Sequence, residues 1–415
     1  MLATLEKGVG IRSGLLDLFS SFNGDNVSAG IVAGIFNIGT LLLITKILQE
    51  AGLAQDQVLS WIFAVFLGGG FLSIVMALYY KKPICGAWSI AGLVLVSASL
   101  SQYTWAEAAG GFFAAGALVF VLGVSGVIKR LVSFLPRPII MAMIAGILLR
   151  FGVGIMTSLE EAPLVSGAIL LVFLLSQRFF PRFPGVLAAL IAGGVIVAFT
   201  NQGGWEPVVF RLAAPVFARP VLIPQAFLGI SVPLAITVMG AENMQAMGIL
   251  LTEGYDRIPQ GTKVPINAMT AVSGAAMMVA SLAGGHSVNM AGVLTAICGG
   301  DSAGPDKEKR YAAAVVTGLI TMGFGLFAGT LVLWMGAYPE AVINLIAGLA
   351  LMGALITSFK GAWAGSYSYG AFFAFITAVS GLSAWGIGAP FWALVLGLSV
   401  SFLLDRPQSK IQDNK

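Results

Sequence analysis

Two ionisable side chains stand in apolar surroundings, where each could carry a proton or hold a small ligand. Glu242 is the one acidic residue that we place well inside an apolar helix, and His286 is the only histidine of the 415-residue chain. A buried carboxylate is costly in hydrocarbon and usually lines a cavity or relays protons. We therefore predict that Glu242 carries a coupled proton. The alternative places Glu242 at the end of its helix, facing water.

The stretch around His286 predicts a broken helix. The apolar run from His286 to Cys298 is shorter than the roughly 20 residues that a membrane-spanning helix needs. It therefore predicts a half-helix that begins at membrane depth, where free backbone N–H groups attract anions. Broken helices near the midplane are where many secondary transporters bind substrate. The alternative is one long helix kinked at Gly284-Gly285, with His286 merely packed.

Histidine could itself carry the proton, because its charge changes near neutral pH. We rank His286 below Glu242 as the proton carrier, because the positive end of a helix disfavours a protonated imidazole.

Two further places could contact a ligand. Trp88 and Ser89 follow the helix breakers Pro83 and Gly86, and an aromatic ring beside a half-helix could stack on a flat substrate. The alternative for Trp88 is an anchor at the membrane interface. Asn37 is a polar residue in an apolar segment, where it could bind substrate or bond a neighbouring helix.

The composition defines the broad class of protein. The chain is 58% hydrophobic and 10% charged, which predicts an all-α polytopic membrane protein. Its net charge of +4 is spread along the chain, so we expect no nucleic-acid partner. Cys85 and Cys298 have no metal-site spacing, and we find no phosphate-binding loop and no catalytic constellation. We therefore expect no enzyme activity, no cofactor and no metal.

Hydrophobic segments predict fourteen membrane crossings. They lie at 27–48, 58–80, 84–100, 105–125, 137–157, 163–179, 184–200, 224–243, 265–283, 286–299, 311–334, 339–358, 367–385 and 389–404. With both termini in the cytoplasm, the inside segments hold all of the 22 basic residues except Lys46, Arg150, Arg211 and Arg219. This bias follows the positive-inside rule and predicts a multi-pass protein of a bacterial-type inner membrane.

The segments between and beyond the crossings complete the organisation. Residues 1–26 predict an amphipathic helix on the membrane surface, and 405–415 predict a cytoplasmic tail. An external loop at 201–222 divides the chain into repeats of seven segments, 27–200 and 223–404. Because seven is odd, the second repeat must enter the membrane in the opposite sense, as in an inverted-topology repeat.

Weak internal similarity supports this repeat. Ile90-Ala91-Gly92-Leu93 resembles Met290-Ala291-Gly292-Val293, and Ile144-Ala145-Gly146 matches Ile346-Ala347-Gly348, at offsets of 200 and 202. The two short segments, the third and the tenth, occupy equivalent positions in the two repeats. This arrangement predicts a binding site between two facing half-helices.

These residues resemble a known family. The run from Gly284 through Ala291, continuing over 295–298 to Pro305-Asp306 and Arg310-Tyr311, is similar to the benzoate:proton symporters, the benzoate membrane transport proteins. The resemblance extends to Pro83-Ile84, to Ala87-Trp88-Ser89 and to Asn243. Two positions depart from that family. Ile90-Ala91 stands where the family usually has Thr-Pro, and Glu242 stands where the family tends to have Gln. An acidic residue at the position of Glu242 is more typical of nucleobase permeases.

The resemblance implies the fold of the uracil permease and anion-exchanger group. That fold would have a core domain at about 27–125 and 224–334 and a gate domain at about 137–200 and 339–404. Short strands would precede the two half-helices, substrate would bind between core and gate, and homodimers are common in that group.

We thus expect a secondary active transporter that carries a small organic anion, such as benzoate or another aromatic carboxylate, together with protons. The expected substrate site comprises Asn37, Trp88, Ser89, Asn243, His286, Ser287, Val288, Asn289 and Met290, with Glu242 as the proton-coupling residue. Three alternatives remain open: a nucleobase-like substrate held by Glu242 and Asn243, a passive anion channel, and a membrane scaffold that binds no small molecule.

Overall fold

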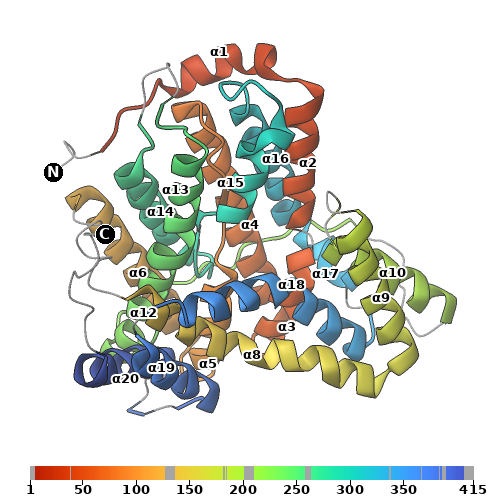
Figure 1. The fold of residues 1–415 in the computed structure, drawn as a ribbon, viewed down its shortest axis with the longest axis vertical. Coiled ribbons are helices and arrows are strands. Elements are labelled where there is room, and N and C mark those ends of the chain that lie inside the picture. The colour runs from red at the N-terminus through yellow and green to blue at the C-terminus, as the bar shows by residue number, and fades with distance from the viewer. Residues whose placement is uncertain are drawn as a thin grey trace, which may run out of the picture.

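The computed structural model describes residues 5–37, 39–126, 136–180, 183, 185–200, 210–257, 263–335, 338–365, 367–382, 384–385 and 389–405 (Figure 1). The first half contains α1 (Ile11–Ser21), α2 (Gly24–Phe36), α3 (Gly39–Glu50), α4 (Gln55–Tyr80), β1 (Gly86–Ala87), α5 (Ile90–Leu100), α6 (Trp105–Ser125), α8 (Arg137–Glu161), α9 (Pro163–Phe179) and α10 (Gly185–Thr200). The second half contains α11 (Pro224–Ala226), η2 (Phe227–Ser231), α12 (Val232–Thr237), η3 (Val238–Asn243), α13 (Met244–Thr252), α14 (Ile266–Ser281), β2 (Asn289–Met290), α15 (Gly292–Gly299), η4 (Asp301–Ala303), α16 (Tyr311–Leu326), α17 (Ala328–Met335), α18 (Glu340–Ala362), α19 (Ser368–Ser380) and α20 (Ala389–Leu404).

Five helical stretches among the described residues are long and apolar enough to cross a membrane. They are Gly24–Glu50, Gln55–Tyr80, Trp105–Ser125, Arg137–Glu161 and Pro224–Leu251. Two further stretches are bent pairs: α16 meets α17 at 71°, and α18 bends by 41° within its length. The other apolar helices are shorter. The expected apolar, multi-pass helical protein is therefore confirmed, whereas the number of fourteen crossings stays a prediction.

The helices pack in two groups. In the first group, α4 packs on α16, α6 packs on α14, and α2 lies against α16. In the second group, α8 packs on both α18 and α19, α19 packs on α20, and α9 packs on α10. We call α1–α6 with α11–α17 the first group, and α8–α10 with α18–α20 the second group. In Figure 1, α8, α19 and α20 lie toward the bottom of the picture, at about the level of α5, and α1 lies at the top.

The packing partners repeat in the way that two related halves would require. In such a repeat, each predicted segment of the first half corresponds to the segment seven places later. The packing of α4 on α16 then corresponds to that of α14 on α6, and the packing of α9 on α10 to that of α19 on α20. The contacts of α8 with α18 and of β1 with β2 each join two corresponding segments. Ile90 and Gly292, which begin α5 and α15, are 202 positions apart. This spacing equals the offset of 202 and lies within two residues of the offset of 200 that the sequence shows.

The N-terminal segment forms a shorter amphipathic helix than 1–26. The helix α1 covers Ile11–Ser21, and α2 already begins at Gly24 because Asn23 caps it with its side chain. Leu16 and Phe19 are exposed on α1, whereas Gly14 packs on the first group, where its carbonyl accepts a hydrogen bond from the Tyr311 hydroxyl (3.1 Å). One apolar face of α1 is thus left uncovered, as a surface helix requires.

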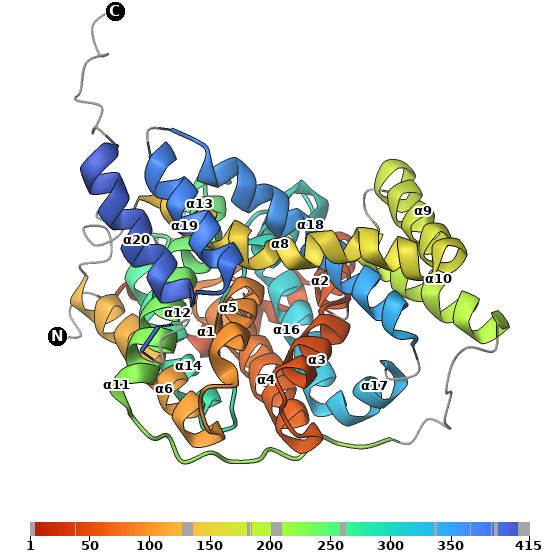
Figure 2. The same ribbon diagram turned by 90° about the horizontal axis from the view of Figure 1, so that it is seen from below.

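The described part of the predicted external loop 201–222 is extended and runs across one end of the first group (Figure 2). The backbone N–H of Ala218 donates to the Leu282 carbonyl (2.7 Å), and that of Val221 donates to the Ala106 carbonyl (2.9 Å). This segment therefore ties together helix ends that lie far apart in the sequence.

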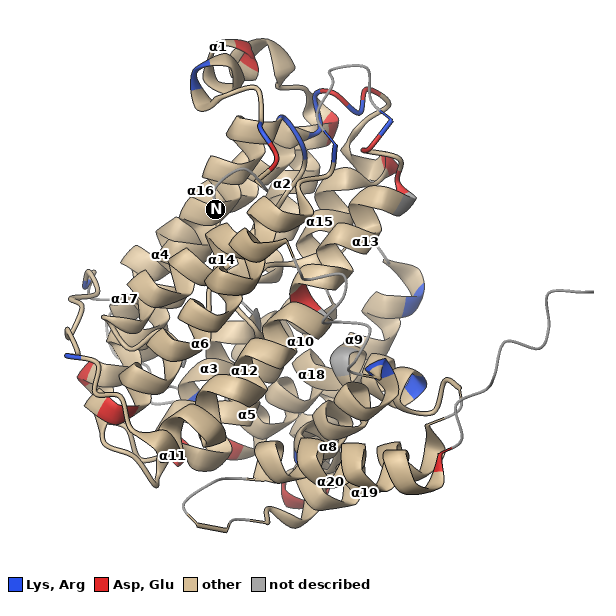
Figure 3. Ribbon diagram, turned by 90° about the vertical axis from the view of Figure 1, so that its left-hand side faces the viewer, with Lys and Arg blue, Asp and Glu red and all other residues tan. Residues whose placement is uncertain are grey.

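Charged residues gather at the ends of the helices, and the middle of the bundle is largely free of them (Figure 3). At the end that holds α1, Lys81 bonds Asp17, the Lys82 ammonium donates to the Tyr255 carbonyl (2.6 Å), and the Lys307 ammonium donates to the Glu253 carbonyl (2.6 Å). Three of the connections that the sequence assigned to the inside, those near Lys81, Tyr255 and Lys307, thus meet at one end of the molecule.

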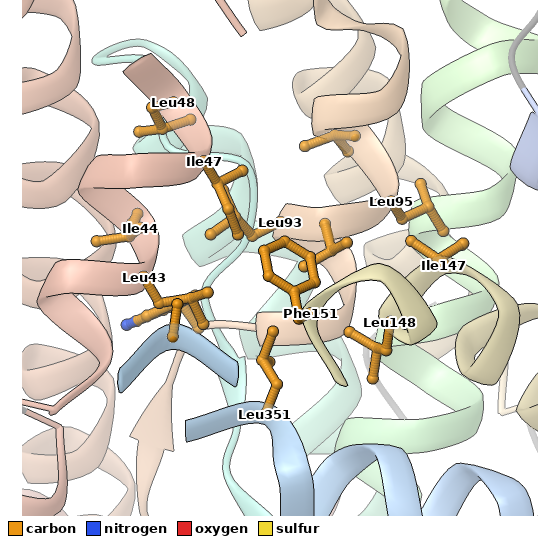
Figure 4. Packing of buried hydrophobic residues seen from close by; sticks show 14 of the residues in the cluster. Leu43, Ile44, Ile47, Leu48, Leu93, Leu95, Ile147, Leu148, Phe151 and Leu351 are labelled. Atoms are coloured by element: carbon orange, nitrogen blue, oxygen red, sulfur yellow. The ribbon is translucent and has the colours of Figure 1, made fainter. Parts of the chain in front are cut away.

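A large apolar cluster joins the two groups (Figure 4). Leu43, Ile44 and Ile47 of α3 and Leu93 of α5 belong to the same buried cluster as Phe151 of α8. Lipid tails are as apolar as these side chains, so van der Waals packing within the cluster, and not removal from water, holds the two groups together here.

Candidate functional site

Two strand–helix units cross at the centre of the first group. The strands β1 and β2 pair antiparallel, with Gly86 opposite Met290 and Ala87 opposite Asn289. The helices α5 and α15 begin directly after these strands. Gly86 must lack a side chain, because a Cβ there would lie 2.5 Å from the Gly69 carbonyl oxygen of α4.

This backbone corrects the expected helix from His286 to Cys298. The chain leaves α14 at Ser281, runs through an extended stretch and β2, and becomes helical only at Gly292. His286 therefore lies before the helix and not at its first turn. The kinked continuous helix is also wrong, because four residues from Gly285 to Val288 adopt no helix.

Ser89 is the most connected polar residue between the two units. Its backbone N–H donates to the Ser287 hydroxyl (2.9 Å), and its hydroxyl accepts from the Gly92 N–H (2.8 Å), which caps α5. The same hydroxyl donates to Oε1 of Glu242 (2.8 Å). Ser89 is fully buried, so these bonds fix the position of the Glu242 carboxylate relative to the beginning of α5.

His286 is buried with both ring nitrogens bonded. The Trp61 indole N–H donates to Nδ1 (2.9 Å), and Nε2 lies 2.9 Å from the Ser89 carbonyl oxygen, to which its N–H donates. This pattern fits the neutral Nε2–H tautomer, because an added proton on Nδ1 would face the Trp61 donor. In this arrangement His286 fixes the backbone of Ser89 from the side that faces away from the cavity.

A cavity of about 420 Å³ lies between the two groups. The first group contributes Trp88 of the β1–α5 connection, Glu242 of η3 and the residues Ala291–Leu294 at the beginning of α15. The second group contributes residues of α8 and α18. The volume falls in the range of about 300–1,000 Å³ that is typical of small-molecule sites, so one small organic molecule fits.

The structure divides the predicted substrate-site residues into two sets. Asn37, Trp88 and Glu242 line the cavity. The remaining seven are buried behind its wall: Ser89, Asn243, His286, Ser287, Val288, Asn289 and Met290. Asn243 shows how the second set acts, since its Oδ1 accepts from the Met290 N–H (2.9 Å) and from the Ser273 hydroxyl (3.2 Å). The buried residues therefore fix the backbone that carries the cavity-lining residues.

Asn37 combines both roles that its sequence context suggested. It ends α2, and its side-chain amide donates to the Thr321 hydroxyl of α16 (3.0 Å). The residue also belongs to the cavity wall. Asn37 thus bonds a neighbouring helix at the end of α2.

Sequence reasoning missed Arg137 as a site residue. Arg137 begins α8 directly after Pro136, and it lines the cavity from the second group. By its sequence context, Arg137 is only one of the basic residues that mark the inside segments. An arginine at the first position of an apolar segment carries no signal that distinguishes a cavity from a membrane surface.

A second, larger cavity of about 950 Å³ adjoins the first. Phe36 lines both, and along α15 the wall passes from Leu294 to Ile297 and then to Asp301 of η4. This cavity leads to the end of the molecule where α1 and the charged connections lie. Among the described residues, no cluster of three or more His, Cys, Asp or Glu side chains could hold a metal ion.

Comparison with known proteins places the chain among membrane transport proteins. A family described as benzoate membrane transport protein matches residues 20–403. The benzoate membrane transport protein of Acinetobacter baylyi is 29% identical over 383 residues, which cover 92% of this chain and 95% of that relative. The inner membrane protein YdcO of Escherichia coli is 33% identical over 348 residues, which cover 84% and 87%.

Solved structures share the fold at low identity. The transmembrane domain of the cyanobacterial bicarbonate transporter BicA matches with a TM-score of 0.58 at 12% identity, over 91% of this chain and 96% of that domain. The murine anion transporter Slc26a9 in an inward-facing state matches with a TM-score of 0.60 at 14% identity, over 94% of this chain and 70% of that protein. These likenesses concern the architecture alone.

Proposed function

Because the chain belongs to the benzoate membrane transport protein family, we propose that it is a proton-coupled symporter of a small aromatic carboxylate. The observation that carries this proposal is the position of Glu242. Its carboxylate lines the cavity between the two groups and is held by Ser89 at the capped beginning of α5. A carboxylate that faces a small-molecule cavity inside an apolar bundle can load and release a proton with the substrate.

In this proposal the first group is the core domain and the second group is the gate domain. The chain crosses the membrane fourteen times, and α5 and α15 are the half-helices of the third and tenth segments. The repeated packing partners and the pairing of β1 with β2 support this division. Substrate binds between core and gate, so movement of one group against the other exposes it to each side in turn.

The substrate carboxylate binds near the beginning of α15, where the N-cap Ala291 offers no side-chain acceptor to the first N–H groups. Trp88 contributes an apolar surface to the same cavity, beside Ala91 of α5. An aromatic carboxylate suits such a wall, because one end of it is charged and the rest is flat and apolar.

We further propose that the larger cavity opens to the cytoplasm and that the structure is open to the inside. The cavity leads to the end that carries α1 and the Lys-rich connections, in keeping with the positive-inside rule. Because Cys85 and Cys298 are both buried, introduced cysteines can be labelled with an impermeant thiol reagent over a low background. Ala214→Cys should react from outside intact cells and Ser302→Cys should not, and the reverse pattern would refute this orientation.

Transport by purified protein in liposomes tests the function. Wild type should exchange labelled for unlabelled benzoate and should concentrate benzoate when only a proton gradient is applied. Glu242→Gln keeps size and hydrogen bonding but stays neutral, so it should retain exchange and lose gradient-driven accumulation. The matched control is Glu253→Gln, at the other end of α13 and away from the smaller cavity. If Glu242→Gln still concentrates benzoate, Glu242 is not the coupling residue.

The alternatives receive less support. A nucleobase held directly by Asn243 is disfavoured, because that side chain is 1% exposed and its oxygen already accepts two hydrogen bonds. An open channel is disfavoured by the apolar cluster that joins α3, α5 and α8 beyond the cavity. Exchange that is accelerated by substrate on the opposite side separates a carrier from a channel, and a scaffold would bind no small molecule.

A further inference from the structure

The cavity holds a second charge that the proposed function does not use. Arg137 and Glu242 are the charged residues among those that line it, one from each helix group. The arginine is exposed, and no ion pair joins it to another described residue. A guanidinium stays charged under all conditions relevant to a protein, so the cavity carries a permanent positive charge.

We propose that Arg137 is the counter-charge for the substrate carboxylate, so that the charge of the site is zero in both the empty and the loaded carrier. This inference rests on the proposed function, because it concerns the same cavity and the same proton carrier. It adds the residue that selects an anion and the charge balance of the site in each of its two forms.

The charge balance follows from the two side chains. In the empty carrier, the positive Arg137 and the ionised Glu242 sum to zero. In the loaded carrier, the anion adds one negative charge and the proton on Glu242 removes one, so the sum is again zero. A site that is neutral in both forms moves no net charge as the groups rearrange, and it never presents an uncompensated charge to the apolar interior.

No other ionisable group of the described residues disturbs this balance. The elements packed against η3 are α8, α12, α13, α14 and β2, and of these only α8 brings a charged side chain to the cavity. His286 lies behind Ser89 with both nitrogens bonded. Arg150, in the middle of α8, donates to the Ser97 hydroxyl of α5 (3.4 Å) and is not part of the cavity wall.

The position of Arg137 also matters for how the site closes. Its guanidinium can grip a carboxylate with two parallel hydrogen bonds, which an ammonium cannot match. Because Arg137 belongs to the second group and the beginning of α15 to the first, a carboxylate between them draws the two groups together.

The experiment uses the full-length protein in liposomes, with the membrane potential set by potassium and valinomycin and with a fixed proton gradient. For wild type, an inside-negative potential should leave the rate of benzoate uptake unchanged within about twofold. For Arg137→Gln, the loaded and the empty carrier are each negative, so the steps that move them across the membrane become dependent on the potential. The rate of uptake should then change several-fold between an inside-negative and an inside-positive potential. Arg137→Lys should restore insensitivity to potential, and Arg150→Gln should behave like wild type.

Binding provides a second readout that does not need transport. Benzamide has the shape of benzoate without its charge. Arg137→Gln should weaken benzoate binding about tenfold or more while leaving benzamide binding unchanged, so the preference for the anion is lost.

The outcomes separate the two proposals. If wild type neither binds nor accumulates an aromatic carboxylate, the proposed function fails. If wild type accumulates benzoate but its rate follows the membrane potential, the charge balance is overturned without any variant. If Arg137→Gln binds benzoate as tightly as wild type and stays insensitive to potential, Arg137 is not the counter-charge.

Discussion

The β1–α5 unit and the β2–α15 unit have the same backbone design and different chemistry. Each has a two-residue strand followed by a short helix, and the two strands pair with each other. At the beginning of α5, the side chain of Ser89 caps the helix and holds Glu242. At the equivalent position of α15, Ala291 provides no side-chain cap.

This difference suggests a division of labour within one symmetrical frame. The first N–H groups of a helix need acceptors, and they come from a cap, from water or from a ligand. In the β1–α5 unit the protein supplies the acceptor itself and holds Glu242, the proposed proton carrier, beside it. In the β2–α15 unit no side chain caps the helix, and the proposed anion would supply the acceptor. One unit would then serve the proton and the other the substrate.

The largest expected effect comes from removing the bond network that holds the two units together. In His286→Phe, the Trp61 N–H loses its acceptor in a fully buried place, whereas the Ser89 carbonyl still accepts from the Leu93 N–H (2.9 Å). An unpaired buried N–H costs about 1–3 kcal/mol, so the melting temperature in detergent should fall clearly.

The double variant Trp61→Phe/His286→Phe removes donor and acceptor together and should recover part of this loss. Protein that remains folded should still accumulate benzoate with a proton gradient. An undiminished melting temperature in His286→Phe would mean that this network does not support the site.

A smaller effect on stability is expected from glycine substitutions that compare how tightly α5 and α15 pack. An alanine at Gly92 would place its Cβ 2.8 Å from Leu234, a fully buried side chain, and should destabilise the protein by about 1–3 kcal/mol. An alanine at Gly292 meets the exposed side chain of Gln245, which can move aside, so stability should change little.

Gly248→Ala is the control for this pair, because nothing lies within 4 Å of the added Cβ. Thermal melting of all three variants ranks them. Equal losses at Gly92 and Gly292 would contradict the difference in packing.

The smallest expected effect tests the caps directly. Ala291→Ser gives α15 the cap that α5 already has, so the serine hydroxyl competes with substrate for the first N–H groups. Benzoate should bind about tenfold more weakly, which corresponds to the roughly 1.4 kcal/mol of one good hydrogen bond. The protein itself should melt no lower than wild type, because a cap stabilises a helix.

Ala296→Ser, further along α15 and outside the cavity wall, is the matched control for the added hydroxyl. Titration of benzoate by calorimetry or by ligand-induced thermal shift measures the affinities. Unchanged affinity in Ala291→Ser would mean that substrate does not use the beginning of α15.

Much of the fold could be predicted from the sequence, because hydrophobicity is a property of the chain itself. Most of the apolar segments coincide with the observed helices to within a few residues, although the eighth continues to Thr252 and the tenth becomes helical only at Gly292. The described residues 210–222 form no helix, as expected for a loop between the two halves. Glu242 was recognisable as a site residue since a carboxylate within an apolar helix is costly wherever that helix packs. The family was likewise recognisable from the run that begins at Gly284.

Only the tertiary structure decided which side chains meet in the cavity. His286 was singled out because it is unique, yet its partners Trp61 and Ser89 come from segments far away in the chain, and they turn it away from the cavity wall. Arg137 looked like an ordinary charge at the end of a segment, and it became a site residue because α8 packs across from η3 and α15. Hydrophobic periodicity indicates which residues of a segment are shielded from water. It does not report which surface of another segment that residue will face, because that depends on contacts between residues far apart in the sequence.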